Sequence, residues 1–414
     1  MSLDFLTSKF IINEHDFKTP IIVTGAGGCI GSWVLSILTK SKIPCVGFDL
    51  SESKRRLNLI LGDDAEKVPW EKNDVTNYPE LLNLVKKYNP SAIIHLAGLQ
   101  VPFCAADPAL GARVNVEGTI NVFEACREIG LRRIVYASSV ASLGMPPGGK
   151  WKETFYGVYK QANEHTAYVY NSDLQIPSIG IRPNIVYGLT RDQGVSSKNT
   201  IAIQSAVLDE EYDIPYKGKY SWLYAGEAAS AFIYSVMQEF TKAYVFNLNG
   251  QCETIENGIS ILKSLKPEAK VTCSGQNFPF PPDLSDEPLR KLIGNYPTYS
   301  VEEGISDTYN SFKQLKELGR CPEINKDNWV DISNNQIKSY KEEGAILLKG
   351  VFIDWVKTLE TGIEKLIKNP SPRERSYLPE DGTAKFFQDL CNWNRIDEFK
   401  DCLLYTSDAA DDAW

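Results

Sequence analysis

Short runs of consecutive apolar residues alternate along much of the chain with longer stretches in which apolar residues recur at helical spacing. The consecutive runs predict buried strands at 21–23, 43–50, 92–96 and 133–139. The periodic stretches predict amphipathic helices at 32–38, 78–88, 115–129 and 155–170. Strands that alternate with helices are typical of a parallel sheet with helices on its faces, so the pattern predicts an α/β fold.

The first predicted strand and helix are joined by a glycine-rich turn at 24–31, Thr-Gly-Ala-Gly-Gly-Cys-Ile-Gly. Gly25 permits a tight turn, Gly28 lets the backbone approach a phosphate, and Gly31 lets the helix pack closely on the strand. A pyrophosphate at this turn would face the N-terminus of the helix. Taken alone, the three glycines also fit an ordinary turn.

The second predicted strand ends in Asp49, about 20 residues beyond the turn. A carboxylate there accepts hydrogen bonds from an adenosine ribose and repels a 2′-phosphate, which favours NAD over NADP. Lys54, Arg55 and Arg56 follow closely. They could serve a phosphate, although three consecutive basic residues are also typical of a solvated surface.

Tyr156 and Lys160 are four residues apart on a predicted helix and therefore share one of its faces. An ammonium group near a tyrosine lowers the phenol pKa from about 10 toward a range useful for proton exchange. The fourth predicted strand ends in Ser138 and Ser139, at the edge where parallel sheets bind ligands. The alternative interpretations are a chance surface pair and ordinary loop serines.

Composition narrows the choice of partner. The chain has 414 residues, of which 43% are hydrophobic, and a net charge of −9, which favours a small-molecule substrate over nucleic acid or an anionic membrane. The nine cysteines are scattered without Cys-x-x-Cys spacing, which predicts free thiols and a cytoplasmic protein. Residues 1–18 lack the apolar core of a signal peptide, and no apolar run is long enough for a membrane span.

Together these features resemble the extended short-chain dehydrogenase/reductase family, also called the NAD-dependent epimerase/dehydratase family. The resemblance covers about residues 19–320 and includes Asp74-Val75, His-Leu-Ala-Gly at 95–98, Asn115, Ser138-Ser139 and Arg-Pro-x-x-Val-Tyr-Gly at 182–188. It implies a doubly wound parallel sheet of the Rossmann type, a smaller substrate lobe mainly over 187–320, and NAD as cofactor. It also implies a homodimer that pairs through the helices near 115–129 and 156–170.

The same resemblance implies roles for individual residues. Ser139 would position the substrate oxygen, Tyr156 would act as acid and base, and Lys160 would hold the nicotinamide ribose and lower the tyrosine pKa. His95 would be structural. The positions implied to bind the cofactor are Gly25, Gly28, Cys29, Ile30, Gly31, Asp49, Asp74, Val75, Leu96, Ala97, Gly98, Asn115, Tyr156, Lys160 and Pro183.

Departures from the family pattern narrow the range of expected reactions and substrates. Dehydratases of the family carry Asp-Glu after the position of Ser139, and Val140-Ala141 follows here, which argues against dehydration. Sugar-nucleotide members carry an Asn before Val-Tyr-Gly and a later Arg-Asp pair, and the nearest residues here are Ile185 and Tyr220-Ser221. These losses favour a small polyol or sugar acid over a nucleotide diphosphate. The candidate substrate contacts are Ser139, Asn184 and Arg191.

Three functions remain open at this point. The first is an NAD-dependent dehydrogenase acting on a carbinol, and the second is a nucleotide-sugar epimerase similar to UDP-glucose 4-epimerase, which would return the hydride to the other face of a bound keto intermediate. The third is a non-catalytic NAD-binding regulatory module.

The pattern changes after residue 320. Residues 321–332 are a predicted polar linker, and residues 333–401 resemble the opening of a phytanoyl-CoA dioxygenase family domain, a truncated α+β segment with a helix expected at 355–368. All three histidines, His15, His95 and His165, precede this segment, so we expect it to hold no metal. Residues 402–414 resemble translated sequencing adapter, and we expect the natural chain to continue differently after Asp401.

Overall fold

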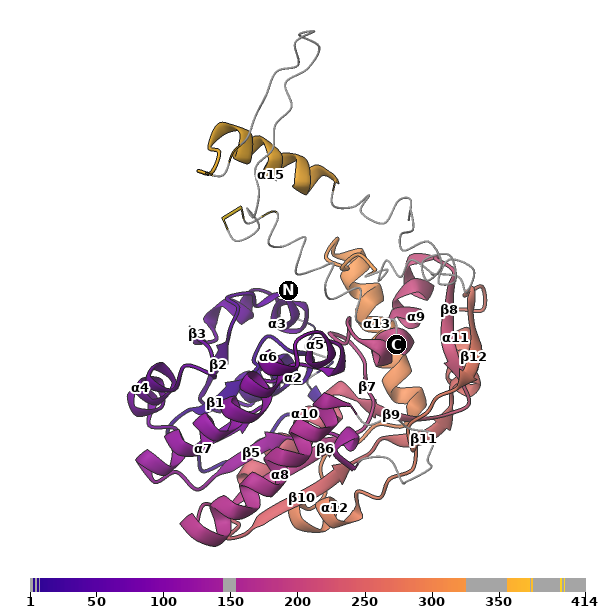
Figure 1. Ribbon diagram of the computed structural model, residues 1–414. Helices are drawn as coiled ribbons and strands as arrows, with labels where there is room; N and C mark the ends of the chain where they lie inside the picture. The colour runs from indigo at the N-terminus through magenta and orange to yellow at the C-terminus, as the bar shows by residue number, and fades with distance from the viewer. Residues whose placement is uncertain are drawn as a thin grey trace, which may run out of the picture. The chain divides into compact units, whose positions relative to one another are not determined.

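A seven-stranded sheet organises the first part of the computed structural model (Figure 1). Every neighbouring pair of its strands is parallel. In spatial order the strands are β10 (Ala243–Leu248), β6 (Ser178–Pro183), β5 (Ile134–Ala137), β4 (Ala92–His95), β1 (Ile21–Thr24), β2 (Cys45–Asp49) and β3 (Trp70–Lys72). The strand order reverses between β1 and β4, and open α/β sheets bind ligands at such a switch point.

The structure describes residues 3, 6, 8–143, 154–324, 356–372, 374, 395–396 and 398. The chain divides into two compact units, Met1–Ile324 and Asn325–Trp414. Residues 321–324, which we expected to open the linker, are assigned to the first unit.

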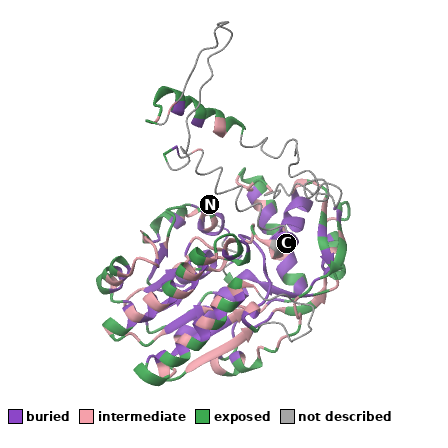
Figure 2. Ribbon diagram, in the orientation of Figure 1, coloured by how far each residue is buried: buried purple, intermediate pink, exposed green. Residues whose placement is uncertain are grey.

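Helices cover both faces of the large sheet because its strands are apolar on both sides. In β1, Ile22 packs into one core cluster, whereas Ile21 and Val23 pack into the other. The first cluster is completed by α4 (Tyr78–Tyr88), α7 (Gly118–Ile129) and α8 (Phe155–Leu174). The second includes α2 (Cys29–Lys40), α3 (Arg55–Leu61) and α10 (Ala225–Met237). Figure 2 shows the central strands of this sheet buried and the edge strand β10 mainly of intermediate exposure, with exposed residues on the outer sides of the helices. The doubly wound α/β fold is therefore confirmed.

A smaller lobe follows β6 along the chain. Its three-stranded sheet has the order β11 (Gln251–Thr254), β9 (Lys219–Tyr224) and β7 (Val186–Tyr187), and its two-stranded sheet pairs β12 (Val271–Asn277) with β8 (Tyr212–Lys217). Its helices are α9 (Lys198–Leu208), α11 (Ile255–Leu265), α12 (Glu287–Ile293) and α13 (Val301–Glu317). Tyr187, Trp222 and Tyr224 are buried, and the Tyr187 ring contacts the rings of both Trp222 and Tyr224, so aromatic packing supplies much of this lobe's core.

Short elements complete the first unit. They are α5 (Val101–Ala106), α6 (Pro108–Ala112), the π-helical turn η2 (Arg113–Glu117) and the 3-10 turns η1 (Gly62–Lys67), η3 (Val140–Leu143) and η4 (Val195–Ser197). The helix predicted from residue 115 therefore begins as a π-helical turn and continues as α7.

In the second unit the structure describes one helix, α15 (Val356–Lys368), where we predicted a helix at 355–368. Most of the α+β segment predicted at 333–401, and the terminal segment 402–414, lie outside the described residues. All cysteines in the described part of the chain are free thiols. Within that part, no helix is long and apolar enough to cross a bilayer.

Candidate active site

The glycine-rich turn between β1 and α2 packs closely against the backbone around it and leaves the N-terminus of α2 without a side-chain cap. Gly25 has a φ of +67°, and a Cβ there would lie 2.7 Å from the backbone nitrogen of Ala97. A Cβ on Gly31 would lie 2.2 Å from the carbonyl oxygen of Gly25. Helix α2 begins at Cys29, followed by Ile30, and its N-cap, Gly28, offers no side chain to the first-turn N–H groups. These groups are therefore available to a pyrophosphate, which this turn fits.

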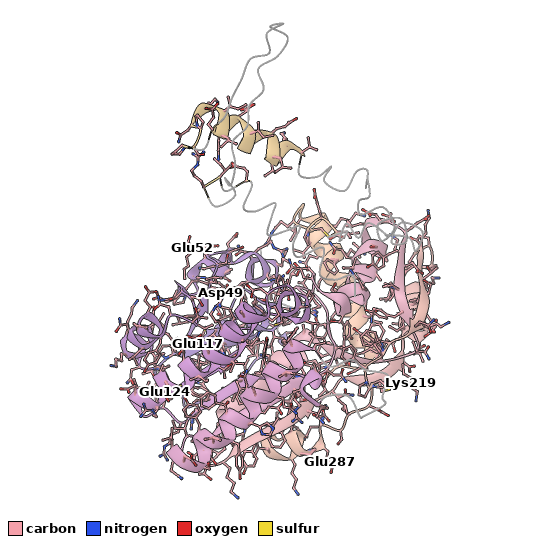
Figure 3. All side chains as sticks on the ribbon, viewed as in Figure 1. Asp49, Glu52, Glu117, Glu124, Lys219 and Glu287 are labelled. Atoms are coloured by element: carbon pink, nitrogen blue, oxygen red, sulfur yellow. The ribbon has the colours of Figure 1, made fainter. Side chains whose placement is uncertain are left out.

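Asp49 stands at the carboxyl end of β2, next to this turn (Figure 3). Its Oδ2 atom accepts a hydrogen bond of 2.9 Å from the N–H of Gly27, and its Oδ1 atom accepts one of 3.0 Å from the N–H of Ser51. The carboxylate is thus held beside the glycine-rich turn, where the adenosine ribose of a dinucleotide lies in Rossmann folds.

The other predicted cofactor residues lie at the same edge of the sheet. Asp74 and Val75 follow β3, and the Asp74 side chain accepts a hydrogen bond from the N–H of Thr76 at 2.8 Å. Leu96 and Ala97 follow β4, and both N–H groups donate to the Thr24 hydroxyl at 3.2 Å. Pro183 ends β6. The topology therefore brings together residues that are far apart in sequence.

His95 links this edge to the helix layer behind it. The Thr24 hydroxyl, which accepts the two N–H groups, is 2.7 Å from His95 Nδ1 and can donate to it. The Thr119 hydroxyl donates to the Asn115 carbonyl at 2.7 Å and lies 3.1 Å from His95 Nε2, from which it can accept. Both contacts suit a neutral imidazole, and burial lowers the pKa of His95 to about 3. The structure thus gives His95 a structural role.

Asn115 is turned into the site by the π-helical turn. Its Nδ2 atom donates to the carbonyls of Leu99 and Gly111, each at 3.1 Å, while its buried Oδ1 atom has no partner among the described residues. A Cβ added to the exposed Gly98 would lie 2.6 Å from this Oδ1 and 3.2 Å from Lys160 Nζ. This polar recess, which only a glycine leaves open, fits the hydroxyls of a nicotinamide ribose.

Lys160 is buried on α8 and faces the end of β5. Its Nζ atom donates to the Ala137 carbonyl at 2.9 Å and lies 5.6 Å from the ring centroid of Tyr156. Burial lowers the pKa of Lys160 to about 8, and Cys104 and Glu164 act in the opposite direction.

Tyr156 and Ser139 meet at the same place. Burial raises the pKa of Tyr156, while a hydrogen bond from Ser139 and the charge of Arg191 act to lower it. We expected Lys160 to lower this pKa. Its ammonium group instead donates to the Ala137 carbonyl, and burial of the phenol dominates.

A buried carboxylate that the sequence analysis missed fixes the geometry of this helix. Glu164 accepts hydrogen bonds from the Ser142 hydroxyl and from Nε of Arg182, both at 2.7 Å, and from the Ser138 hydroxyl. It therefore ties α8 to the ends of β5 and β6 and to η3. Its position four residues after Lys160, on the same helical face, is the signal that could have identified it.

Of the other two predicted substrate contacts, Asn184 is occupied by hydrogen bonds within the protein, whereas Arg191 is only partly so. The Asn184 amide group donates to Asn249 at 2.7 Å and to the Pro281 carbonyl at 2.9 Å, and its oxygen accepts from the N–H of Ile185. These bonds occupy its side chain in the smaller lobe. Arg191 donates through Nη2 to Ser196 at 2.6 Å, and its buried Nε atom has no partner in the described part of the chain.

The arrangement suits hydride transfer on a dinucleotide. The glycine-rich turn, Asp49, and the recess at Gly98 could hold the two ends of NAD, and the hydroxyl groups of Tyr156 and Ser139 would then lie near its nicotinamide end. Within the described residues no three His, Cys, Asp or Glu side chains gather as metal ligands.

Comparison with known proteins assigns the class. Residues 21–248 match the sequence profile of the NAD dependent epimerase/dehydratase family. This match covers more than half of the chain, and the chain therefore belongs to that family.

A sequence relative agrees with this membership, and solved structures agree with the fold. A UDP-glucose 4-epimerase of Mycolicibacterium smegmatis is 27% identical over 319 residues, which is 72% of this chain and 99% of that protein. An L-threonine dehydrogenase from Clostridium difficile superposes with a TM-score of 0.63 at 20% identity, over 74% of this chain and 99% of that one. A Thermus thermophilus UDP-glucose 4-epimerase in complex with NAD superposes with a TM-score of 0.58 at 21% identity, over 71% and 99%. The chain is an NAD-dependent enzyme, an oxidoreductase or an epimerase, and NAD is its cofactor.

Proposed function

We propose that this enzyme is a dehydrogenase that takes hydride from the carbinol carbon of a small sugar-like or sugar-acid substrate. The observation that carries the proposal is the meeting of Ser139, Tyr156 and Lys160 beside the recess at Gly98. NAD, when bound, supplies the hydride acceptor.

The residues of the chain supply the proton chemistry. Ser139 positions the substrate hydroxyl, and Tyr156 takes its proton as the C–H bond is broken. Because burial raises the pKa of Tyr156, its phenolate depends on positive charge nearby; among the described residues the charge of Arg191 acts to lower this pKa, and the Lys160 ammonium lies 5.6 Å from the ring centroid. Lys160 also binds the ribose from its position beside Gly98.

The preference for a small substrate is supported by residues of the smaller lobe. Ile185 is buried, and Tyr220 is fully buried with its hydroxyl 3.3 Å from the Ser196 carbonyl. The Ser221 hydroxyl donates to Asn249 at 2.9 Å. These positions therefore offer no cation to a nucleotide diphosphate, whereas Arg191 offers its unpaired Nε to a single anionic group.

The second candidate is an epimerase that acts on a nucleotide sugar. It is supported by the Mycolicibacterium smegmatis UDP-glucose 4-epimerase, which this chain matches along 99% of that protein's length. In that case the keto intermediate turns over in the site and receives the hydride on its other face, and no NADH accumulates.

A single assay separates the candidates. The purified full chain is mixed with NAD and, in separate reactions, with a panel of sugar acids, polyols and UDP-sugars. Absorbance at the NADH band and chromatography of the sugars are then followed together. A dehydrogenase produces NADH and oxidised product in equal amounts, and an epimerase interconverts two sugars without net NADH. Binding of NAD without turnover of any substrate would overturn the dehydrogenase proposal and leave a regulatory NAD-binding module.

We also propose that two copies of the chain pair through α8. Five of its apolar side chains are between 47% and 67% exposed: Phe155, Val158, Tyr168, Val169 and Leu174. Such a concentration of exposed apolar residues on one helix is typical of a protein interface. Three of them, Phe155, Val158 and Val169, share one face of the helix at 100° per residue. The proposed partner of this face is a second copy, which would place two α8 helices against each other.

Two further assignments belong to the same proposal. The catalytic domain comprises about residues 19–320, within the first unit, and residues 333–401 are a separate fragment. The free cysteines in the described residues suit a cytoplasmic enzyme, since thiols persist in a reducing compartment.

A further inference from the structure

Arg55 and Arg56, the basic residues that follow β2, are paired with an acid from a distant part of the chain. Asp192 lies in the loop between β7 and η4. Nε and Nη2 of Arg56 donate to its Oδ1 atom at 2.9 and 2.6 Å, and Arg55 donates to its Oδ2 atom. Arg56 also donates to Gln193 at 3.1 Å. One carboxylate therefore holds both guanidinium groups.

This ion cluster adjoins the predicted adenosine ribose site. The carbonyl of Gly27 accepts a hydrogen bond of 2.9 Å from Nη1 of Arg56, and the N–H of the same glycine donates to Asp49. Asp49 and Arg56 are thus hydrogen-bonded to the same residue of the glycine-rich turn, Asp49 through the N–H of Gly27 and Arg56 through its carbonyl. Lys54, by contrast, donates to the Val68 carbonyl at 3.0 Å and to two neighbouring carbonyls.

The cluster is partly shielded from water. The exposed fraction of the side chain is 18% for Arg56 and 21% for Asp192, whereas Arg55, on the outer side of the cluster, is 51% exposed. Burial opposes ionisation of Asp192, but the charges and hydrogen bonds of Arg56 and Arg55 outweigh it and lower its pKa. The carboxylate is therefore ionised at neutral pH and neutralises one of the two arginine charges.

In dinucleotide-binding folds an acid at the end of the second strand binds the ribose of NAD, whereas an arginine nearby accommodates the 2′-phosphate of NADP. This chain has both, with two arginines within seven residues of Asp49. Asp49 alone repels a 2′-phosphate, but two free guanidinium groups beside it would offset that repulsion. The arrangement selects NAD only if these groups are otherwise engaged.

We propose that Asp192 is a specificity residue for the cofactor: it engages Arg55 and Arg56 so that neither can bind a 2′-phosphate. A residue of the smaller lobe thereby contributes to the selection of NAD over NADP at the end of β2. The loop also covers the turn, since Thr190, at a φ of +79°, places its hydroxyl 3.4 Å from Cys29 Sγ. Asp192 acts through the arginines and need not touch the cofactor.

The test compares Asp192→Asn with the parent chain in calorimetric titrations with NAD and with NADP. The substitution keeps the size of the side chain and removes its charge. We expect the ratio of the two dissociation constants to shift toward NADP by about tenfold or more, with NAD affinity changed by about twofold or less. Adenosine 2′,5′-bisphosphate and ADP serve as fragment probes, because only the first carries the 2′-phosphate.

Two further variants make the result decisive. Adding Arg55→Ala and Arg56→Ala to Asp192→Asn is expected to abolish the gain in NADP affinity. The matched control is Asp209→Asn, which alters an acid paired with Lys266 and Lys316 in the smaller lobe and is expected to change neither affinity. An unchanged ratio in Asp192→Asn, or an equal loss of both affinities, would overturn the proposal. Because only binding is measured, the result is independent of which substrate the enzyme oxidises.

Discussion

At the scale of single residues, Tyr156 and Tyr159 lie three positions apart on α8 and differ in what surrounds their hydroxyl groups. Tyr156 meets Ser139 near Lys160, whereas Tyr159 donates to the Pro108 carbonyl at 2.8 Å. We predict that Tyr156→Phe lowers kcat by about 10²- to 10⁴-fold, because it removes the group that takes the substrate proton. NAD affinity, measured by calorimetry, should be unchanged.

Tyr159→Phe is the matched control for this prediction, since it also removes one tyrosine hydroxyl group from α8. It should retain near-parent turnover. If Tyr156→Phe were to keep parent turnover instead, the acid and base role would belong to another residue.

His95 makes stability depend on pH. In the folded protein burial lowers the pKa of His95 to about 3, whereas a histidine in the unfolded chain has a pKa of about 6.5. Between these values the unfolded chain binds more protons, so the free energy of unfolding decreases as the pH falls through this window. From pH 7 to pH 5, His95 should account for a loss of about 2 kcal/mol.

Urea denaturation of the parent and of His95→Gln at pH 7 and pH 5 checks this prediction. The variant is less stable at pH 7, since it breaks the links to Thr24 and Thr119, but it should lose less stability on acidification. The control is His165→Gln, at an exposed position of α8, which should lose as much as the parent. An identical loss in all three proteins would contradict the assignment.

At the scale of elements, α8 serves two environments with opposite faces. One face carries Lys160 and Glu164 against the ends of β5 and β6, and the other exposes Val158 and Val169, at 50% and 52%. A helix of 20 residues can carry both sets of side chains because residues at different positions of the 3.6-residue repeat point to different sides of the helix.

We predict that Val158→Glu combined with Val169→Glu converts the proposed dimer to a monomer. Two charges on each copy would have to be buried without partners at the contact. Light scattering during size-exclusion chromatography measures the mass. Asn83→Glu, at an exposed position of α4, is the control and should leave the mass unchanged. A parent chain that is already monomeric at micromolar concentration would refute the proposed pairing.

At the scale of the whole molecule, the first unit contains its own cores. Among the described residues, neither hydrophobic cluster of this unit includes a side chain beyond Cys321. The unit nevertheless uses residues after Arg320, because the Gln204 side chain donates to the Pro322 carbonyl at 2.7 Å. A truncation that spares the unit should therefore end at Ile324 and not at Arg320.

We predict that deleting residues 325–414 leaves the Tm and NAD affinity nearly unchanged. Thermal denaturation and calorimetric titration of the truncated and full-length chains check this expectation. A truncated chain that fails to fold, or a full-length chain that purifies with stoichiometric iron, would show that residues 325–414 have a structural or metal-binding role.

The sequence by itself determined the features that depend on neighbours along the chain. Strand β1, the glycine-rich turn and α2 are contiguous, and their spacing together with Asp49, about 20 residues further on, indicates a dinucleotide site. The four-residue interval between Tyr156 and Lys160 likewise identifies one helical face. These inferences concern periods and intervals, which a sequence displays directly.

The tertiary structure decided what depends on contacts across the fold. Asp192 and Arg56 are separated by 136 positions, and no local pattern shows that their charges meet. The Tyr156 pKa followed the same rule: the interval to Lys160 suggested a lowered value, but burial, which depends on every element packed around the phenol, raised it. Spacing along the chain identifies which groups are present, whereas the solvent exclusion and charge pairing that set their chemistry are established only when distant segments pack together.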